Sequence, residues 1–218
     1  MAGDLCRKRC GGRTRSGWWG VVVVLGLAAG CQRPKELRVP LDYRPTDKLE
    51  IPGVTIPSGV HIAVVASDKR DDPSAIGRND EEKVPVPIYA TDLRTPDQFL
   101  RDVVSRELGN AGLIVASEPG GAPRVLHLTL TQFWIDETSR YHGMVVADAE
   151  LTAGRQRLWQ GRVSGSNERF GRSLSAENYQ EVFTDSTIDL VQNLLRAPGF
   201  VPALTQAPPH APAGKRRR

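Results

Sequence analysis

The chain has 218 residues with 29 basic and 25 acidic side chains, which gives a formal net charge of +4. Residues 1–30 hold five basic side chains and one acid, and residues 215–218 are all basic, so residues 31–214 carry −4. The positive charge therefore lies at the two ends of the sequence. This excludes a folded basic face that could follow a nucleic-acid backbone, and no nucleic-acid partner is expected.

The first thirty residues have the order of a bacterial lipoprotein signal peptide. A basic stretch over residues 7–15 precedes an apolar run over residues 17–29, and small residues lead up to Cys31. As a helix, the apolar run is about 20 Å long, too short for the roughly 30 Å of a bilayer core. We expect cleavage between Gly30 and Cys31, acyl and diacylglycerol groups on Cys31, and no other cofactor. The alternative is an ordinary secretory signal or an uncleaved anchor, since Leu27 stands one position before the usual leucine of the motif.

The three cysteines fit the same division. Cys6 and Cys10 lie in the segment expected to be removed, which leaves Cys31 as the one cysteine of the mature chain. A mature chain without a disulfide must be stabilised by its packed core. The isolated spacing of Cys6 and Cys10 does not match a zinc site, and no metal is expected.

Residues 31–59 are rich in proline, which fixes the backbone dihedral φ and removes a hydrogen-bond donor. We expect an extended tether between the anchor and the folded domain. Alternatively, parts of it, such as residues 49–51, pack on the edge of the domain. The prolines are Pro34, Pro40, Pro45, Pro52 and Pro57.

The domain is predicted over residues 60–196. Residues 60–66 are nearly all apolar and indicate a central strand. Residues 67–92 carry many charges and several prolines, which predicts a long surface loop with one short extended piece near residues 84–89.

A helix is predicted to begin after Thr95, because Thr95 is a good N-cap, Pro96 suits the first position and Gln98 completes a capping box. The glycines at 109 and 112 end it, and a short strand over residues 113–116 follows.

Three strands are expected next, over residues 124–135, 144–151 and 156–164, where apolar and polar side chains alternate. Their short connections predict an antiparallel meander. A second amphipathic helix is expected over residues 175–196, and a disordered, proline-rich basic tail over residues 197–218. These elements predict an α+β fold, with a mostly antiparallel four- to five-stranded sheet and two amphipathic helices packed on one face.

The chain resembles the YajG-type bacterial lipoprotein family over residues 60–195. The resemblance implies a membrane-anchored domain that faces the periplasm, with no established enzymatic activity and no catalytic residue to carry over. It rests on the lipobox at Cys31, the Asp68-Lys69-Arg70 sequence, Phe99-Leu100, residues 126–130 and Thr187-Ile188-Asp189.

Asp68 and Arg70 are the first candidates for a site, as a ligand-binding or a structural pair. They follow the expected central strand, and their spacing of two places both side chains on one side of the chain. A solvated charged loop is the simpler interpretation. Trp134 and Trp159 lie on expected strands, where exposed aromatic rings can hold glycans or lipids, although core packing is more common.

No catalytic residue is expected, because the four histidines form no ligand or triad pattern. The expected function is that of an outer-membrane lipoprotein with a periplasm-facing binding or assembly domain, since Gln32 is not the aspartate that favours retention in the inner membrane. The alternative is an accessory subunit of an envelope transport or lipopolysaccharide-assembly complex. Expected partners are membrane lipid through Cys31 and an envelope protein or peptidoglycan. The oligomeric state and the role of the basic residues 215–218 stay open.

Overall fold

The computed structural model describes residues 36–80, 84–171 and 174–206. Gly30, Cys31 and residues 207–218, including the basic C-terminus, lie outside the described residues. The described strands are β1 Leu37–Val39, β2 His61–Asp68, β3 Ala75–Asn79, β4 Val86–Ala90, β5 Ile114–Ala116, β6 Val125–Glu137, β7 Arg140–Ala153 and β8 Gln156–Phe170. The described helices are α1 Pro96–Asn110, α2 Ala176–Arg196 and α3 Phe200–Thr205, with a 3-10 turn at Pro119–Gly121.

The long strands β6, β7 and β8 form the antiparallel meander that the alternating pattern predicts. Leu126, Leu128 and Leu130 of β6 are buried, while His127 is exposed. The apolar side chains on one face of β7, such as Val145, are also buried against the helices. The period of two places one face of the meander in the core and the other in solvent.

The predicted sheet of four to five mostly antiparallel strands is wrong. The described residues form an eight-stranded mixed sheet, in which β1 pairs with β4, β2 with β5, and both β2 and β3 with β6, all in parallel. Strands β1 and β3 have three and five residues. Segments this short, in proline-rich or charged surroundings, carry too little periodicity to be recognised.

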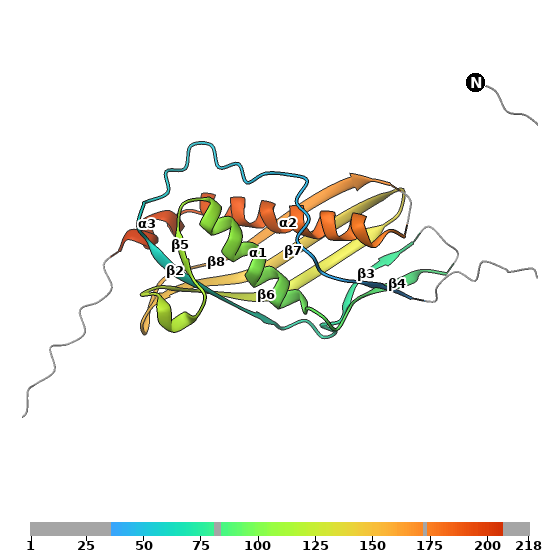
Figure 1. Cartoon of the computed structure of the whole chain (residues 1–218), viewed down its shortest axis with the longest axis horizontal. Helices are drawn as coiled ribbons and strands as arrows, with labels where there is room; N and C mark the ends of the chain where they lie inside the picture. Colours follow the sequence, from blue (N-terminus) through green and yellow to red (C-terminus); the bar gives the residue numbers. More distant parts are fainter. Residues whose placement is uncertain (1–35, 81–83, 172–173, 207–218) are drawn as a thin grey trace, which may run out of the picture. The chain divides into compact units, whose positions relative to one another are not determined.

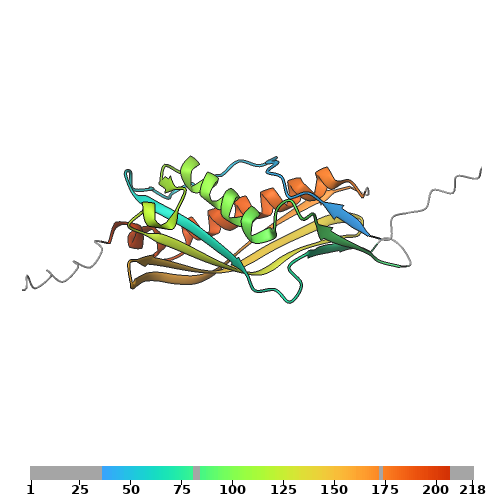
Figure 2. The ribbon, with the colours of Figure 1, turned by 60° about the horizontal axis from the view of Figure 1, so that its bottom comes forward.

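Both long helices lie on one face of this sheet, where Figure 2 shows them above the strands. Helix α1 begins as predicted, with the backbone N–H of Thr95 donating to Oε1 of Gln98 at 3.3 Å. Helix α2 lies very close to the sheet at Gly165 of β8, where an added Cβ would come within 2.1 Å of the Ser186 carbonyl oxygen. A residue without a side chain is therefore required at this crossing.

The centre of the core joins the two helices to β6 through three aromatic rings. Phe133 of β6 stacks on Phe183 of α2, with ring centroids 4.0 Å apart. The rings of Phe133 and Phe99 of α1 form a T-shaped pair, with centroids 5.9 Å apart. All three side chains are at most 1% exposed. Such aromatic pairs add about 0.5–1.5 kcal/mol to the free energy of burial.

Most of the predicted tether is part of the domain. Residues 40–51, which we call the strap, run alongside α2, as the blue segment of Figure 1 shows. The Asp185 carboxylate accepts hydrogen bonds from the backbone N–H groups of Thr46 and Asp47 at 2.9 and 3.1 Å and from the Thr46 hydroxyl. Oγ1 of Thr184 accepts from the N–H of Arg44 at 3.0 Å. The alternative, in which these residues pack on the domain, is the correct one for residues 36–51.

The predicted disorder after residue 196 is also wrong for its first ten residues. Helix α3 places Phe200 against Trp159, with ring centroids 5.0 Å apart, and Nε1 of Trp159 donates to the Pro198 carbonyl at 2.9 Å. Pro202 is tolerated because it lies in the first turn, where backbone N–H groups lack helical partners anyway. The domain therefore extends beyond the predicted residues 60–196 on both sides, through the strap and through α3.

Candidate functional site

The strand β6 contains a bulge that decides which side chains face solvent. The register with β7 shifts between Leu130 and Gln132, and the Thr131 hydroxyl donates to the Val146 carbonyl at 3.2 Å. One extra residue reverses the alternation. Phe133 therefore enters the core, while Trp134 moves to the face opposite the helices.

Near this bulge, the edge of β6 that faces away from β7 passes from one neighbouring strand to another. Strand β2 pairs with β6 up to Leu130, and β3 begins to pair at Ile135. Arg70 occupies the gap between them. Its Nη1 donates to the carbonyl oxygens of Phe133 at 3.1 Å and Ala75 at 2.7 Å, and its Nη2 donates to the Pro73 carbonyl at 2.6 Å. The guanidinium thus supplies hydrogen bonds where none of the described strands pairs with this edge of β6.

Asp68 holds this guanidinium in place. Its carboxylate accepts from Nε and Nη2 of Arg70, with the shorter contact at 2.7 Å, and the two side chains are 7% and 9% exposed. Together with the three carbonyl contacts, these bonds use all five N–H donors of the guanidinium. The structure brings Asp68 and Arg70 together as an internal pair, in a place where a solvated loop was the simpler expectation.

Next to this pair, the open face of the sheet is hollowed around one aromatic ring. One hollow of about 320 Å³ lies between Arg70, Asp72 and Trp134. A second, of about 280 Å³, lies on the other side of the ring, and both are lined by Gln132 and Trp134. We call six of the residues that line the second hollow the Trp134 surface: Gln132, Trp134, Asp136, His142, Met144 and Glu168.

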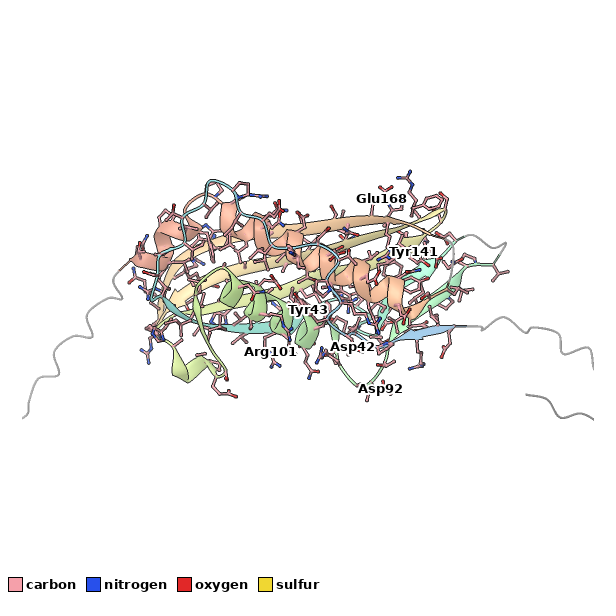
Figure 3. The ribbon with its side chains drawn as sticks, turned by 45° about the horizontal axis from the view of Figure 1, so that its top comes forward. Asp42, Tyr43, Asp92, Arg101, Tyr141 and Glu168 are labelled. Atoms are coloured by element: carbon pink, nitrogen blue, oxygen red, sulfur yellow. The ribbon has the colours of Figure 1, made fainter. Side chains whose placement is uncertain are left out.

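The Trp134 surface has an apolar centre and a rim of paired charges. Met144 is 42% exposed beside the half-buried indole of Trp134. Nε1 of Trp134 donates to Oδ1 of Asp136 at 3.0 Å, which fixes the ring against the sheet. At the far rim, labelled in Figure 3, the hydrogen bond from Arg140 lowers the pKa of Glu168. Such a surface can stack on a planar or apolar ligand group and donate or accept hydrogen bonds around it.

A third hollow, of about 390 Å³, lies on the same face near the other end of the meander. It is lined by His127, Asp148 and Arg162, and Nε of Arg162 lies 3.0 Å from Oδ1 of Asp148. Its charged side chains are mostly exposed, and its lining contains no tryptophan, tyrosine, phenylalanine or methionine. It therefore provides a contrast to the Trp134 surface.

Of the remaining predicted residues, only His142 joins this site, and it lies at the rim. Trp159 is partly buried and packs against Phe200 of α3, beside the core. Nδ1 of His142 lies 3.4 Å from Oε2 of Glu168 at the rim, and His127 lies in the third hollow.

Within the described ranges, no three histidine, cysteine or acidic side chains lie where they could hold a metal ion. Of the helices that the structure describes, none is long and apolar enough to cross a membrane.

Sequence reasoning gave the packing of the strap only as an alternative, and it missed a buried polar pair. Tyr179 of α2 donates a hydrogen bond to the fully buried carboxylate of Glu137, and burial together with that carboxylate raises the pKa of Tyr179. For the strap, the available signal was the run of four consecutive polar residues from Thr184 to Thr187 in an amphipathic helix. Buried polar groups need partners, and the strap supplies two of them.

No protein-family model and no curated protein sequence matches the chain. A solved structure does share its fold. The crystal structure of a Xanthomonas campestris protein of the family model DUF330 aligns over 73% of this chain and 95% of its own, with a TM-score of 0.51 and 16% identity. At that identity, the likeness shows the fold alone.

Two further structures are less similar. A candidate lipoprotein from Caulobacter crescentus matches 50% of this chain and 82% of its own, with a TM-score of 0.39 and 13% identity. Lipoprotein GNA1162 from Neisseria meningitidis matches 51% and 84%, with a TM-score of 0.30 and 16% identity. These scores are too low to carry an argument. None of the three is named as a YajG-type protein, so that resemblance stays a hypothesis.

Proposed function

We propose that the chain is an outer-membrane lipoprotein, anchored through acyl groups on Cys31, whose domain faces the periplasm. The signal-peptide pattern that ends at Cys31 supports the anchor. The first residue that the structure describes, Glu36, follows the proposed modified residue by five positions, so the proposed cleavage site lies before the described part of the domain. Two or more acyl chains anchor a protein stably, whereas one alone binds marginally. Gln32 in place of aspartate supports the outer membrane.

The domain acts as a binding or assembly module through the Trp134 surface. The observation that carries this proposal is the bulge in β6, which turns a tryptophan out of an otherwise regular strand onto the open face. The Asp68–Arg70 pair holds the backbone beneath it. Aromatic side chains with a polar rim are typical of binding surfaces. The proposed partner is an envelope protein or peptidoglycan, and no catalytic step is proposed.

A second candidate is an accessory subunit of an envelope transport or lipopolysaccharide-assembly complex. The edge of β8 favours it, because this strand has 15 residues and, within the described sheet, pairs only with β7. Side chains of α2 cover part of that edge: Asp189 accepts from the Ser166 N–H at 2.9 Å, and Asn193 donates to the Ser164 carbonyl at 2.9 Å. The uncovered part could receive a strand from a partner.

The anchor is tested by replacing Cys31 with alanine. The wild-type protein should incorporate labelled palmitate and sediment with membranes, while Cys31→Ala should lose the label and appear in the soluble periplasmic fraction. Retention of the label by Cys31→Ala would overturn the anchor.

The binding surface is tested by a photo-crosslinking residue introduced at Met144 in intact cells. We expect a discrete adduct that disappears when Trp134→Ala is added. The same crosslinker at Arg155, in the exposed β7–β8 turn, serves as the control. An adduct that forms equally from both positions, or that survives Trp134→Ala, would contradict the surface. If the crosslinking residue is placed on the edge of β8 instead, a partner that crosslinks only from there would favour the second candidate.

A further inference from the structure

Six strands reach the same end of the sheet, which is the end where the described chain begins. Asn79 pairs with both Val86 and Glu137. Arg140 pairs with Phe170 on the next strands. Neighbouring strands are about 4.8 Å apart, so this row is roughly 24 Å wide. We call it the anchor end, and across the sheet its strand-end residues are Leu37, Val86, Asn79, Glu137, Arg140 and Phe170.

Two large apolar side chains are exposed at this end. Phe170 is 78% exposed at the last position of β8, and Val84 is 76% exposed two residues before β4 begins. A single exposed apolar residue needs no explanation. These two lie on opposite sides of the anchor end, with β3, β6 and β7 between their strands.

The chain length between the proposed anchor and the domain is short. Glu36, the first described residue, follows Cys31 by five positions. A fully extended chain covers at most about 3.6 Å per residue, so Cys31 lies within roughly 18 Å of Glu36. An anchored domain therefore keeps this end near the lipid. The opposite end, which carries β5 and α3, is separated from it by the length of the meander (Figure 1).

Three exposed arginines that the structure describes at the anchor end are paired with acidic side chains. Nε of Arg38 lies 3.0 Å from Glu36, and Arg140 is paired with Glu168. Nε of Arg78 contacts Asp80 at 2.8 Å. Because these exposed cations already have acidic partners, attraction to anionic headgroups contributes little, and burial of the apolar side chains is the main term.

We infer that the anchor end is a membrane-contact surface, in which Val84 and Phe170 enter the boundary between headgroups and acyl chains. The inference rests on the proposed anchor at Cys31. It fixes the orientation of the domain, because the Trp134 surface then stands beside the membrane and α3 points away from it.

The experiment attaches the anchor chemically, so that it does not depend on acylation in the cell. The chain from Cys31 onward has a single thiol, which is coupled to a maleimide phospholipid in phosphatidylcholine vesicles with brominated acyl chains. Tryptophan is introduced as Phe170→Trp, as Val84→Trp, or as Ile114→Trp, the last being a 47% exposed control on β5. The circular dichroism of each variant verifies that the domain is folded.

Tryptophan emission at positions 84 and 170 should shift to the blue and lose intensity in brominated vesicles, beyond the change seen for the unsubstituted protein. Ile114→Trp should show neither effect. Quenching at 84 and 170 no greater than at 114 would overturn the inference, and so would quenching that requires anionic lipid. Failure of palmitate labelling at Cys31 in cells would instead overturn the proposed function, which is a separate result.

Discussion

The guanidinium of Arg70 donates a hydrogen bond of 3.1 Å to the carbonyl oxygen of Phe133, in the stretch of β6 where the edge passes from β2 to β3. The Phe133 ring below this carbonyl packs between both long helices. A side chain that follows the central strand therefore supports the backbone of a core residue 63 positions later in the chain.

Replacing Arg70 with methionine should lower the free energy of unfolding by about 3–5 kcal/mol, because the buried carboxylate of Asp68 loses its counter-charge. Arg78→Met is the matched control, since Arg78 pairs with Asp136 on the surface and is 54% exposed. Its cost should be about 0–1 kcal/mol. Urea denaturation of both variants measures the difference, and equal losses would contradict an internal role for Arg70.

Asp185→Asn should release the strap, because the carboxylate accepts hydrogen bonds from two backbone N–H groups and a hydroxyl. We expect a loss of about 1–3 kcal/mol and faster tryptic cleavage after Lys48. Asp189→Asn is the control: the Asp189 carboxylate accepts from one N–H at the edge of β8 and does not contact the strap, so cleavage after Lys48 should keep its wild-type rate. Mass spectrometry of the digest identifies the cut.

Gly165→Ala should displace α2, because the new methyl group would lie 2.1 Å from the Ser186 carbonyl oxygen and 2.2 Å from the Leu190 nitrogen. Overpacking of this kind costs about 1–3 kcal/mol or more. Gly109→Ala in α1 meets nothing within 4 Å and should instead stabilise the helix by about 0.5–1 kcal/mol. Thermal unfolding of the two variants should therefore shift in opposite directions, and a shared direction would contradict the close crossing.

The strap also predicts an alkaline pH dependence through Tyr43, which Figure 3 shows where the strap passes α1. Burial, followed by the 2.7 Å hydrogen bond to Glu107, raises the pKa of Tyr43 to about 12 from 10.0. Below pH 10 the hydroxyl is neutral in both states. Between pH 10 and 12 the unfolded chain releases this proton first, so stability falls as pH rises through that window.

Tyr43→Phe should flatten the decline between pH 10 and 12, measured by urea denaturation at each pH. The absorbance of tyrosinate in the folded wild-type protein should show a late-titrating group that the variant lacks. A parallel decline in both proteins would exclude Tyr43 as its source.

Several elements could be predicted from the sequence because their information is local. The Thr95 cap and the stripe of apolar residues after it define α1, and strict alternation defines the meander from β6 to β8. The lipid attachment at Cys31 is also predicted from local sequence, namely the order of basic, apolar and small residues before it. Cys31 lies outside the described residues, so this attachment stays a prediction.

The tertiary structure decided what depends on partners distant in the chain. Leu37–Val39 forms a strand by pairing with β4, and the strap is held by side chains of α2, among them Thr184 and Asp185. Arg70 could be recognised as charged but not as buried, since the gap that it fills exists only once β2 and β3 have both paired with β6. Pairing energy between distant segments leaves no periodic trace in either segment alone, which is why these contacts, and the surface that they place around Trp134, required the fold.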